Sequence, residues 1–390
     1  MSFFHVCKKL LCLMLSMLLL LSLCTLPIYA LDKSENSNEM IFDCKSAILM
    51  EATTGTVLYE YNAEEALPPA SVTKIMTLLL VMEEIEKGNL KYTDIVTASA
   101  YAASMGGSQI YLKEGEQMCV EDMIKSVVIS SANDAAVALA EHICGSETLF
   151  VQRMNQKAKE LGMDNTHFEN TNGLDDTVVN HLTSAKDIAI MSRELIKYED
   201  ILKYSSTWMD TIRDGSFGLT NTNRLVRFYQ GATGLKTGST AKAKFCVSAT
   251  AKRNGMHLIC VVMGAPSSDI RNSIATQLLN WGFSNYEMYI DTTEVLSPIK
   301  VTSGVENKCQ IYTSDFTIVV KKGEANKVEK SLILPNKVVA PVSIGDKIGY
   351  VEYRINNTLI GKSDIISAET VYKIDFVALF VRILSKFLVK

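Results

Sequence analysis

A serine and a lysine three residues apart open an apolar helix predicted from the sequence. Ser71 and Lys74 have the spacing that places two side chains on one face of a helix. The run at 75–82 is apolar all round, so this helix, predicted at 71–87, is buried. Burial lowers the pKa of a lysine, because it disfavours the charged ammonium. Lys74 is therefore a candidate general base for a nucleophilic Ser71, which lies at the helix N-terminus, where developing negative charge is favoured.

Two further polar motifs follow along the chain. Ser131 and Asn133 lie in a stretch of small residues, where the serine hydroxyl can relay a proton and the amide can hold a substrate carbonyl. Lys236 and Thr237 offer a cation and a hydroxyl suited to a terminal carboxylate. Gly238 lets a substrate backbone lie against a strand.

Each motif alone is a weak signal. The Ser-x-x-Lys spacing recurs at Ser239 and at Ser297, and Ser-x-Asn recurs at Ser34; the ordinary interpretation of such a match is a helix cap or a turn. Only Ser71 opens a long buried helix and has the other two motifs downstream in order. Because all three motifs occur in a matching context, the sequence predicts one acyl-transfer site.

With these motifs in order, the sequence resembles the D-alanyl-D-alanine carboxypeptidases, low-molecular-mass penicillin-binding proteins of the β-lactamase/transpeptidase-like superfamily. The resemblance covers nearly the whole chain beyond residue 30, including the flanking runs at 69–77, 130–140 and 170–174. The candidate catalytic residues are Ser71 as nucleophile, Lys74 as base and Ser131 in proton relay. The candidate substrate-binding residues are Asn133, Lys236, Thr237, Gly238 and Ser239. By the same resemblance, the backbone N–H groups of Ser71 and Ser239 form the oxyanion hole.

The resemblance implies a two-step reaction on peptidoglycan stem pentapeptides. Ser71 attacks the peptide bond between the terminal D-alanines, the last D-alanine leaves, and water hydrolyses the acyl-enzyme. β-Lactams are expected to acylate the same serine as inhibitors. We expect no cofactor and no metal, because no Cys/His cluster has metal-ligand spacing.

The sequence departs from the family pattern at two places. Ala243-Lys244 stands where the family commonly has Ala-Gly, which affects the expected local strand geometry. Arg224 and Arg227 lie near the region where some members place a carboxylate-binding arginine, but neither aligns cleanly, so both are left outside the predicted site.

Two other functions compete with the carboxypeptidase. A β-lactamase shares the three motifs, but the commonest serine type adds a Glu-x-x-x-Asn pattern that the run at 169–173 does not supply. A catalytically silent wall-binding protein would keep the fold, yet it is expected to carry a damaged motif, and none of the three is damaged. The physiological role, in growth, sporulation or morphology, stays open.

Apolar runs and turn signals place the motifs on an antiparallel sheet flanked by helices. Hairpins are predicted at 46–61 and 244–263, each around a glycine-containing turn. Helices are predicted at 71–87, 120–145, 147–162, 181–198 and 270–281. This order predicts an α+β, β-lactamase/transpeptidase-like catalytic domain at 31–286. Beyond it, short Val- and Ile-rich runs between turn residues predict a small all-β domain at 287–369.

The N-terminal segment predicts export. Lys8 and Lys9 precede an uncharged apolar run at 10–26, and Ala30 supplies a small residue for cleavage, which is the layout of a signal peptide at residues 1–30. An uncleaved anchor is the less favoured alternative, because the run is at the lower limit for crossing a bilayer.

Residues 370–390 predict a C-terminal amphipathic helix. Arg382 and Lys386 gather on one side of it, while Ile374, Phe380 and Phe387 lie largely opposite, which is typical of a helix lying in the plane of a membrane surface. A helix docked on the β domain is the alternative. Residues 371–390 are the predicted membrane contact, and we expect the exported enzyme at the outer face of the cytoplasmic membrane.

Composition excludes other classes of protein. The 390 residues include 39 basic and 43 acidic side chains, so the chain has no basic footprint for nucleic acid. Removal of the leader leaves six cysteines, and several of them lie inside apolar runs, which favours free cysteines that pack as small hydrophobes. These six are Cys44, Cys119, Cys144, Cys246, Cys260 and Cys309.

Overall fold

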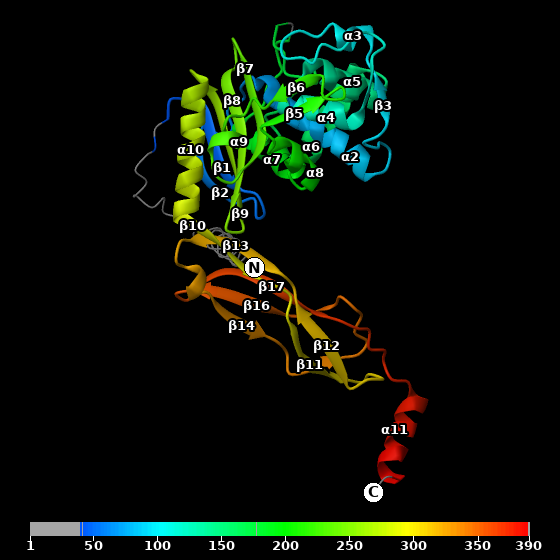
Figure 1. Ribbon diagram of the computed structural model, residues 1–390. Helices are drawn as coiled ribbons and strands as arrows, with labels where there is room; N and C mark the ends of the chain where they lie inside the picture. Colours follow the sequence, from blue (N-terminus) through cyan, green and yellow to red (C-terminus); the bar gives the residue numbers. More distant parts are fainter. Residues whose placement is uncertain (1–39, 41, 177, 389–390) are drawn as a thin grey trace, which may run out of the picture. The chain divides into compact units, whose positions relative to one another are not determined.

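The computed structural model describes residues 40, 42–176 and 178–388 (Figure 1). Chain contacts separate residues 1–42 from residues 43–390, and all the elements named here belong to the second unit. The predicted signal peptide at 1–30 lies outside the described residues, so it stays a prediction.

A five-stranded antiparallel sheet lies at the centre of the catalytic part, in the order β2-β1-β9-β8-β7. Its strands are β1 (Ser46–Glu51), β2 (Val57–Tyr61), β7 (Ala232–Thr240), β8 (Lys244–Arg253) and β9 (Met256–Ala265). Both predicted hairpins are present. Asn254 and Gly255 have φ of +49° and +80° in the β8–β9 turn, the left-handed conformations that a two-residue hairpin turn requires. The pairing of β1 with β9 joins the two hairpins into one sheet.

Helices cover both faces of this sheet. α10 (Ser268–Asn285) packs on β8 and β9, and α7 (Ala185–Leu195) packs on β1 and β9. Figure 1 shows α10 on one side of the sheet and the larger helical group on the other. That group contains α2 (Lys74–Glu86), α4 (Val120–Ile129), α5 (Asn133–Cys144), α6 (Glu147–Glu160) and α8 (Glu199–Ser205). α2 packs against α4, α5, α6 and α7, and its apolar side chains are buried, as the sequence predicted.

The structure corrects three predicted helices. The helix predicted at 71–87 begins as a 3-10 turn, η1 (Ala70–Thr73), and becomes α-helical at Lys74. The stretch predicted at 120–145 is two helices, because Ser131 has a left-handed φ of +64° that breaks the hydrogen-bond ladder between α4 and α5. The helix predicted at 181–198 starts only at α7, where the Ser184 side chain accepts a hydrogen bond from Asp187 N and caps the helix.

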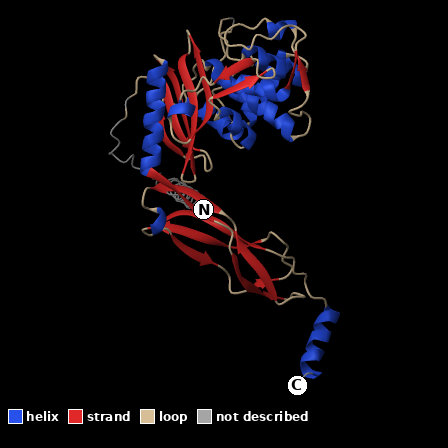
Figure 2. Ribbon diagram, in the orientation of Figure 1, coloured by secondary structure: helices blue, strands red, loops and turns tan. Residues whose placement is uncertain are grey.

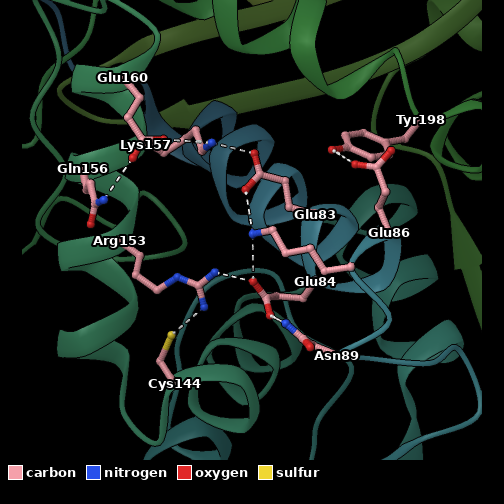
Figure 3. A network of polar contacts seen from close by, with 11 residues as sticks. Glu83, Glu84, Glu86, Asn89, Cys144, Arg153, Gln156, Lys157, Glu160 and Tyr198 are labelled. Carbon is pink, nitrogen blue, oxygen red and sulfur yellow. Dashed lines mark hydrogen bonds and ion pairs between the residues drawn. The ribbon is translucent and has the colours of Figure 1, made fainter.

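An ion-pair network fixes the far end of α2 against α6 (Figure 3). Arg153 Nη2 lies 2.6 Å from Glu84 Oε1, and Lys157 Nζ lies 2.8 Å from Glu83 Oε1. Lys87 contacts both glutamates from the end of α2. Since Lys74 is the first residue of α2, these contacts help to hold the helix that carries it.

Short elements complete the catalytic part. They are β3 (Ile95–Thr97), α3 (Ala100–Ala103), β4 (Gln117–Cys119), β5 (Met209–Ile212), β6 (Phe217–Thr220) and α9 (Leu225–Phe228). β3 pairs with β4, and β5 pairs with β6, both antiparallel. The α+β prediction for this part of the chain is confirmed.

The C-terminal part is built almost entirely of strands (Figure 2). A six-stranded sheet has the order β14-β16-β17-β12-β11-β15, and β10 pairs with β13. The elements are β10 (Tyr286–Asp291), β11 (Val295–Thr302), β12 (Lys308–Thr313), β13 (Phe316–Lys321), η2 (Ala325–Lys327), β14 (Glu329–Ile333), β15 (Val338–Val339), β16 (Lys347–Ile355) and β17 (Thr358–Ser367). Tyr353, which is fully buried, packs in its core with Ile311 and Ile365. The predicted all-β texture is confirmed.

The described part of the chain ends in helix α11 (Phe376–Leu388), which begins six residues later than the helix predicted at 370–390. Val371 instead bridges Val342 and is 2 % exposed within the β core, so the segment before Phe376 is extended. Among the described residues, no helix combines the length and the apolar content needed to cross a membrane. The six cysteines beyond residue 30 are all described, and all six are free.

Candidate active site

Lys74 lies fully buried at the centre of the predicted site. Its Nζ donates hydrogen bonds to Ser71 Oγ at 3.0 Å, to Asn133 Oδ1 at 2.5 Å and to the Asn172 carbonyl at 2.7 Å. Burial, and then the positive charge of Lys236, hold the pKa of Lys74 well below its ordinary value. A neutral amine keeps two N–H donors and gains a lone pair. With Asn133 and Asn172 accepting the two N–H groups, that lone pair faces Ser71 Oγ, as a general base requires.

Ser71 lies on the turn before α2 and is half-buried. The backbone of β7 approaches this turn closely, since a Cβ added at Gly238 would lie 2.8 Å from Ser71 N. Gly238 is therefore necessary for the packing of the strand against the nucleophile turn. The contact also brings the Lys-Thr-Gly motif to Ser71, as the sequence predicted.

Ser131 lies in the break between α4 and α5, and Asn133 is the first residue of α5. Ser131 is buried. The Asn133 amide contacts protein on both sides, because Oδ1 accepts from Lys74 while Nδ2 donates to the Gly106 carbonyl at 2.7 Å. One N–H of Nδ2 remains for a substrate carbonyl. Asn133 thus positions the base as well as offering a donor, and the sequence predicted only the second role.

The Lys-Thr-Gly motif forms part of β7, at the edge of the sheet. Lys236 is almost fully buried, and burial together with the charge of Arg271 lowers its pKa to about 7. Thr237 Oγ1 donates to Thr222 Oγ1 at 2.7 Å. Ser239 is exposed on the same strand. Among the described strands β7 pairs with β8 alone, so its outer edge can pair with an extended peptide.

Arg271 is a further candidate site residue, which the sequence did not predict. It lies in the first turns of α10, is 5 % exposed, and forms no ion pair with any described carboxylate. Two neighbouring buried cations without an acidic partner suit an anionic ligand group. The signal for it was a charged residue on the apolar face of the helix, in register with Ile274 and Leu278.

Arg224 and Arg227, which were left outside the predicted site, make contacts away from it. Arg224 Nη1 lies 3.6 Å from Asp269 Oδ1 on the surface. The Arg227 guanidinium stacks on the rings of Trp208 and Phe228. Neither contact links them to Lys236, which agrees with leaving them out.

The backbone around Asn133 is held by a buried carboxylate. Asp134 is fully buried and accepts hydrogen bonds from Ile110 N and Leu112 N. These contacts keep the segment that carries the Gly106 carbonyl beside Asn133. The carbonyl of Asn172, the third partner of Lys74, was equally outside the sequence prediction, because a backbone acceptor has no residue signature.

The comparisons with known proteins agree with this geometry. A family model described as D-alanyl-D-alanine carboxypeptidase, Peptidase_S11, matches residues 33–267, and the model of the penicillin-binding protein 5 C-terminal domain matches residues 283–373. The chain is 43% identical to the D-alanyl-D-alanine carboxypeptidase DacF of Bacillus subtilis over 91% of its own length and 92% of that protein. It is 33% identical to DacC of Escherichia coli, over 84% of each chain.

A solved structure extends the likeness to three dimensions. Penicillin binding protein 5 from Haemophilus influenzae matches with a TM-score of 0.77 and 30% identity, covering 87% of this chain and 100% of that one. The expected catalytic fold followed by a β domain is therefore confirmed. The chain belongs to the peptidase S11 family of D-alanyl-D-alanine carboxypeptidases.

Proposed function

We propose that this chain removes the terminal D-alanine from peptidoglycan stem pentapeptides through an acyl-enzyme on Ser71. The observation that carries the proposal is the 3.0 Å contact between Ser71 Oγ and the Nζ of a fully buried Lys74. Family membership supports the reaction, and the relatives' names state the same activity.

In the acylation step, neutral Lys74 takes the proton of Ser71 as Oγ bonds to the carbonyl carbon of the penultimate D-alanine. The oxyanion that forms is held by the N–H groups of Ser71 and Ser239. The C–N bond then breaks, and the leaving nitrogen takes a proton through the Ser131 hydroxyl, which Lys74 replenishes. This leaves an ester on Ser71 and a neutral amine at Lys74.

In the deacylation step, water adds to the ester carbonyl while Lys74 takes one of its protons. The ester C–O bond breaks, and Ser71 recovers a proton from Lys74, which restores the starting state. The free edge of β7 aligns the peptide, while Lys236, Thr237 and Arg271 form the pocket for its terminal carboxylate.

The competing functions are separated by one comparison of rates. The released D-alanine from a diacetylated Lys-D-Ala-D-Ala peptide is measured beside the turnover of penicillin by the same preparation. A carboxypeptidase releases D-alanine and clears the penicilloyl ester slowly. Rapid penicillin turnover without D-alanine release identifies a β-lactamase. The absence of both activities identifies a silent wall-binding protein.

We further propose that the exported enzyme is held at the outer face of the cytoplasmic membrane by α11. The N-terminal leader layout supports export. Support for attachment comes from the large apolar side chains of α11, because Phe376 is 81 % exposed and Phe380 is 55 % exposed. Arg382 donates to the carbonyls of Gly304 and Val305, so one side of the helix contacts the β domain.

The attachment is tested with vesicles of anionic phospholipid. The mature chain is expected to sediment with them, and a chain lacking residues 371–390 is expected to stay in solution with its activity retained. If the mature chain stays in solution as well, the helix is a docked surface element and the anchor proposal is wrong.

A further inference from the structure

The residue before the candidate nucleophile has a backbone conformation that needs support. Ala70 is buried and has a φ of +49°, in the left-handed region that residues other than glycine rarely adopt. Two glycines make room for the nucleophile turn, residues 69–73. A Cβ at Gly173 would lie 1.9 Å from the Ala70 carbonyl oxygen, and a Cβ at Gly238 would lie 2.8 Å from Ser71 N. The backbone of Gly173 therefore packs directly against the Ala70 carbonyl, and the backbone of Gly238 packs directly against Ser71 N.

A chain of hydrogen bonds ends on the Ala70 carbonyl. Thr73 Oγ1 donates to Ala70 O at 2.8 Å, and the same hydroxyl lies 2.7 Å from His181 Nε2. His181 Nδ1 in turn accepts from the Glu169 N–H at 3.0 Å. Thr73 and His181 are buried, and they are separated by 108 residues in the sequence.

The donor and acceptor in each of these hydrogen bonds follow from the bond between Glu169 and His181. The Glu169 N–H can only donate, so Nδ1 of His181 carries no proton and Nε2 carries one. His181 Nε2–H then donates to Thr73 Oγ1, which leaves the threonine hydroxyl hydrogen for the Ala70 carbonyl. Burial supports this neutral form, since it lowers the pKa of His181 to about 4.

The Ala70 carbonyl and the Ser71 N–H belong to one planar peptide group. Because that group is rigid and trans, fixing the direction of the carbonyl fixes the direction of the N–H on its opposite side. A hydrogen bond accepted by the carbonyl also polarises the peptide and strengthens its N–H as a donor. The Thr73 hydroxyl therefore acts on both the aim and the strength of the Ser71 N–H.

We propose that Thr73 and His181 are positioning residues that aim and polarise the Ser71 N–H as an oxyanion-hole donor. The inference rests on the proposed function, in which that N–H holds the oxyanion. It adds that the hole depends on two side chains that do not touch the substrate, one of them contributed from the segment before α7.

The test compares Thr73→Val, which keeps the shape and removes the hydroxyl, with Thr73→Ser, which restores it. Removing one oxyanion-hole donor costs roughly 10²–10³-fold in rate, and a misaimed donor loses part of that. We expect Thr73→Val to slow acylation by a chromogenic cephalosporin about 10–100-fold with an unchanged dissociation constant before acylation. Thr73→Ser is expected to recover to within about threefold of the parent.

A matched control for the loss of the Thr73 hydroxyl exists on strand β7. Thr233 Oγ1 lies between another histidine, the half-buried His257 at 3.0 Å, and an acceptor, Thr250 Oγ1 at 2.8 Å. Thr233→Val thus removes a hydroxyl from the same kind of pair without touching the nucleophile turn. It is expected to acylate within about threefold of the parent, which separates positioning from a general loss of stability.

A spectroscopic readout follows the donor directly. The infrared stretch of the acyl carbonyl, identified with a ¹³C label in the β-lactam, is expected at higher wavenumber in Thr73→Val than in the parent, because a weaker donor polarises the ester less. His181→Phe keeps a ring beside Phe168 and removes both hydrogen bonds, and it is expected to behave as Thr73→Val does. The double variant is expected to lose no more than either single one, since both break one chain.

The outcomes distinguish this inference from the proposed function. If Ser71→Ala is still acylated, the proposed function fails. If Ser71→Ala is inert while folded Thr73→Val acylates at the parent rate with an unshifted carbonyl stretch, only the positioning inference is overturned. Should Thr73→Val fail to fold, His181→Phe decides, and acylation by it at the parent rate overturns the inference.

Discussion

Gly238→Ala adds one methyl group where β7 meets the nucleophile turn. The new Cβ would lie 2.8 Å from Ser71 N and from Pro69 O, and 2.9 Å from Val72 N, all of them backbone atoms that cannot rotate away. Ordinary contact starts near 3.4 Å, so the turn must move by about 0.6 Å, which exceeds the roughly 0.5 Å within which a catalytic constellation stays productive. A misplacement of about 1 Å costs on the order of 10²-fold in rate. We therefore expect acylation to slow about 10–100-fold.

The assay is stopped-flow acylation by a fluorescent penicillin, with a thermal melt to show that the variant is folded. Gly218→Ala is the matched control, because Gly218 is also a strand glycine, has no left-handed φ, and has open space around its added Cβ. It is expected to acylate at the parent rate. A folded Gly238→Ala variant that acylates as fast as Gly218→Ala would refute the close packing of β7 against Ser71.

Three further results are expected. Because protonation removes the lone pair of Lys74, the acylation rate of the parent falls as the pH drops through its lowered pKa, and Lys74→Arg, which stays charged, loses roughly 10²–10⁴-fold at every pH; a flat pH profile in the parent contradicts this. The pKa of Lys236 is 10.5 in the unfolded chain and about 7 in the folded protein, so between these pH values the unfolded chain binds more protons and stability rises with pH. Lys236→Met is therefore expected to raise the melting temperature most at pH 7 and below, with a smaller gain toward pH 10.5. The same variant is expected to increase KM for the carboxylate substrate. Asp134→Asn replaces a buried acceptor of the Ile110 and Leu112 N–H groups, and chemical denaturation is expected to show a loss of about 1–3 kcal/mol; an unchanged midpoint would mean that these bonds do not hold the loop.

Local patterns in the sequence predicted the elements that depend on neighbouring residues. The Asn254-Gly255 turn and the apolar run after Lys74 are signals of this kind, and both the β8–β9 hairpin and the buried α2 are present. The break at Ser131 escaped prediction because the small residues on both sides of it are compatible with one continuous helix, and a left-handed serine has no periodic signature. The 3-10 turn before α2 was likewise predicted as α-helix, because residue spacing alone does not distinguish a 3-10 turn from the first turn of an α-helix.

The site was predictable where side chains carry it and unpredictable where tertiary packing does. Ser71, Lys74 and Asn133 come together as the motifs implied, across 59 residues between Lys74 and Asn133. The Asn172 carbonyl reaches Lys74 across 98 residues, and nothing in a sequence marks a backbone acceptor at that range. Arg271 was missed because its neighbour Lys236 lies on a strand, and only the packing of α10 on β8 and β9 brings the two charges together.

The central claim, that Ser71 is the residue acylated, is tested most directly by mass spectrometry of the penicillin-treated mature protein. One penicilloyl group per chain is expected, on the peptide that contains Ser71, and none in Ser71→Ala. A stoichiometric adduct on another residue, or an undiminished adduct in Ser71→Ala, would contradict the account.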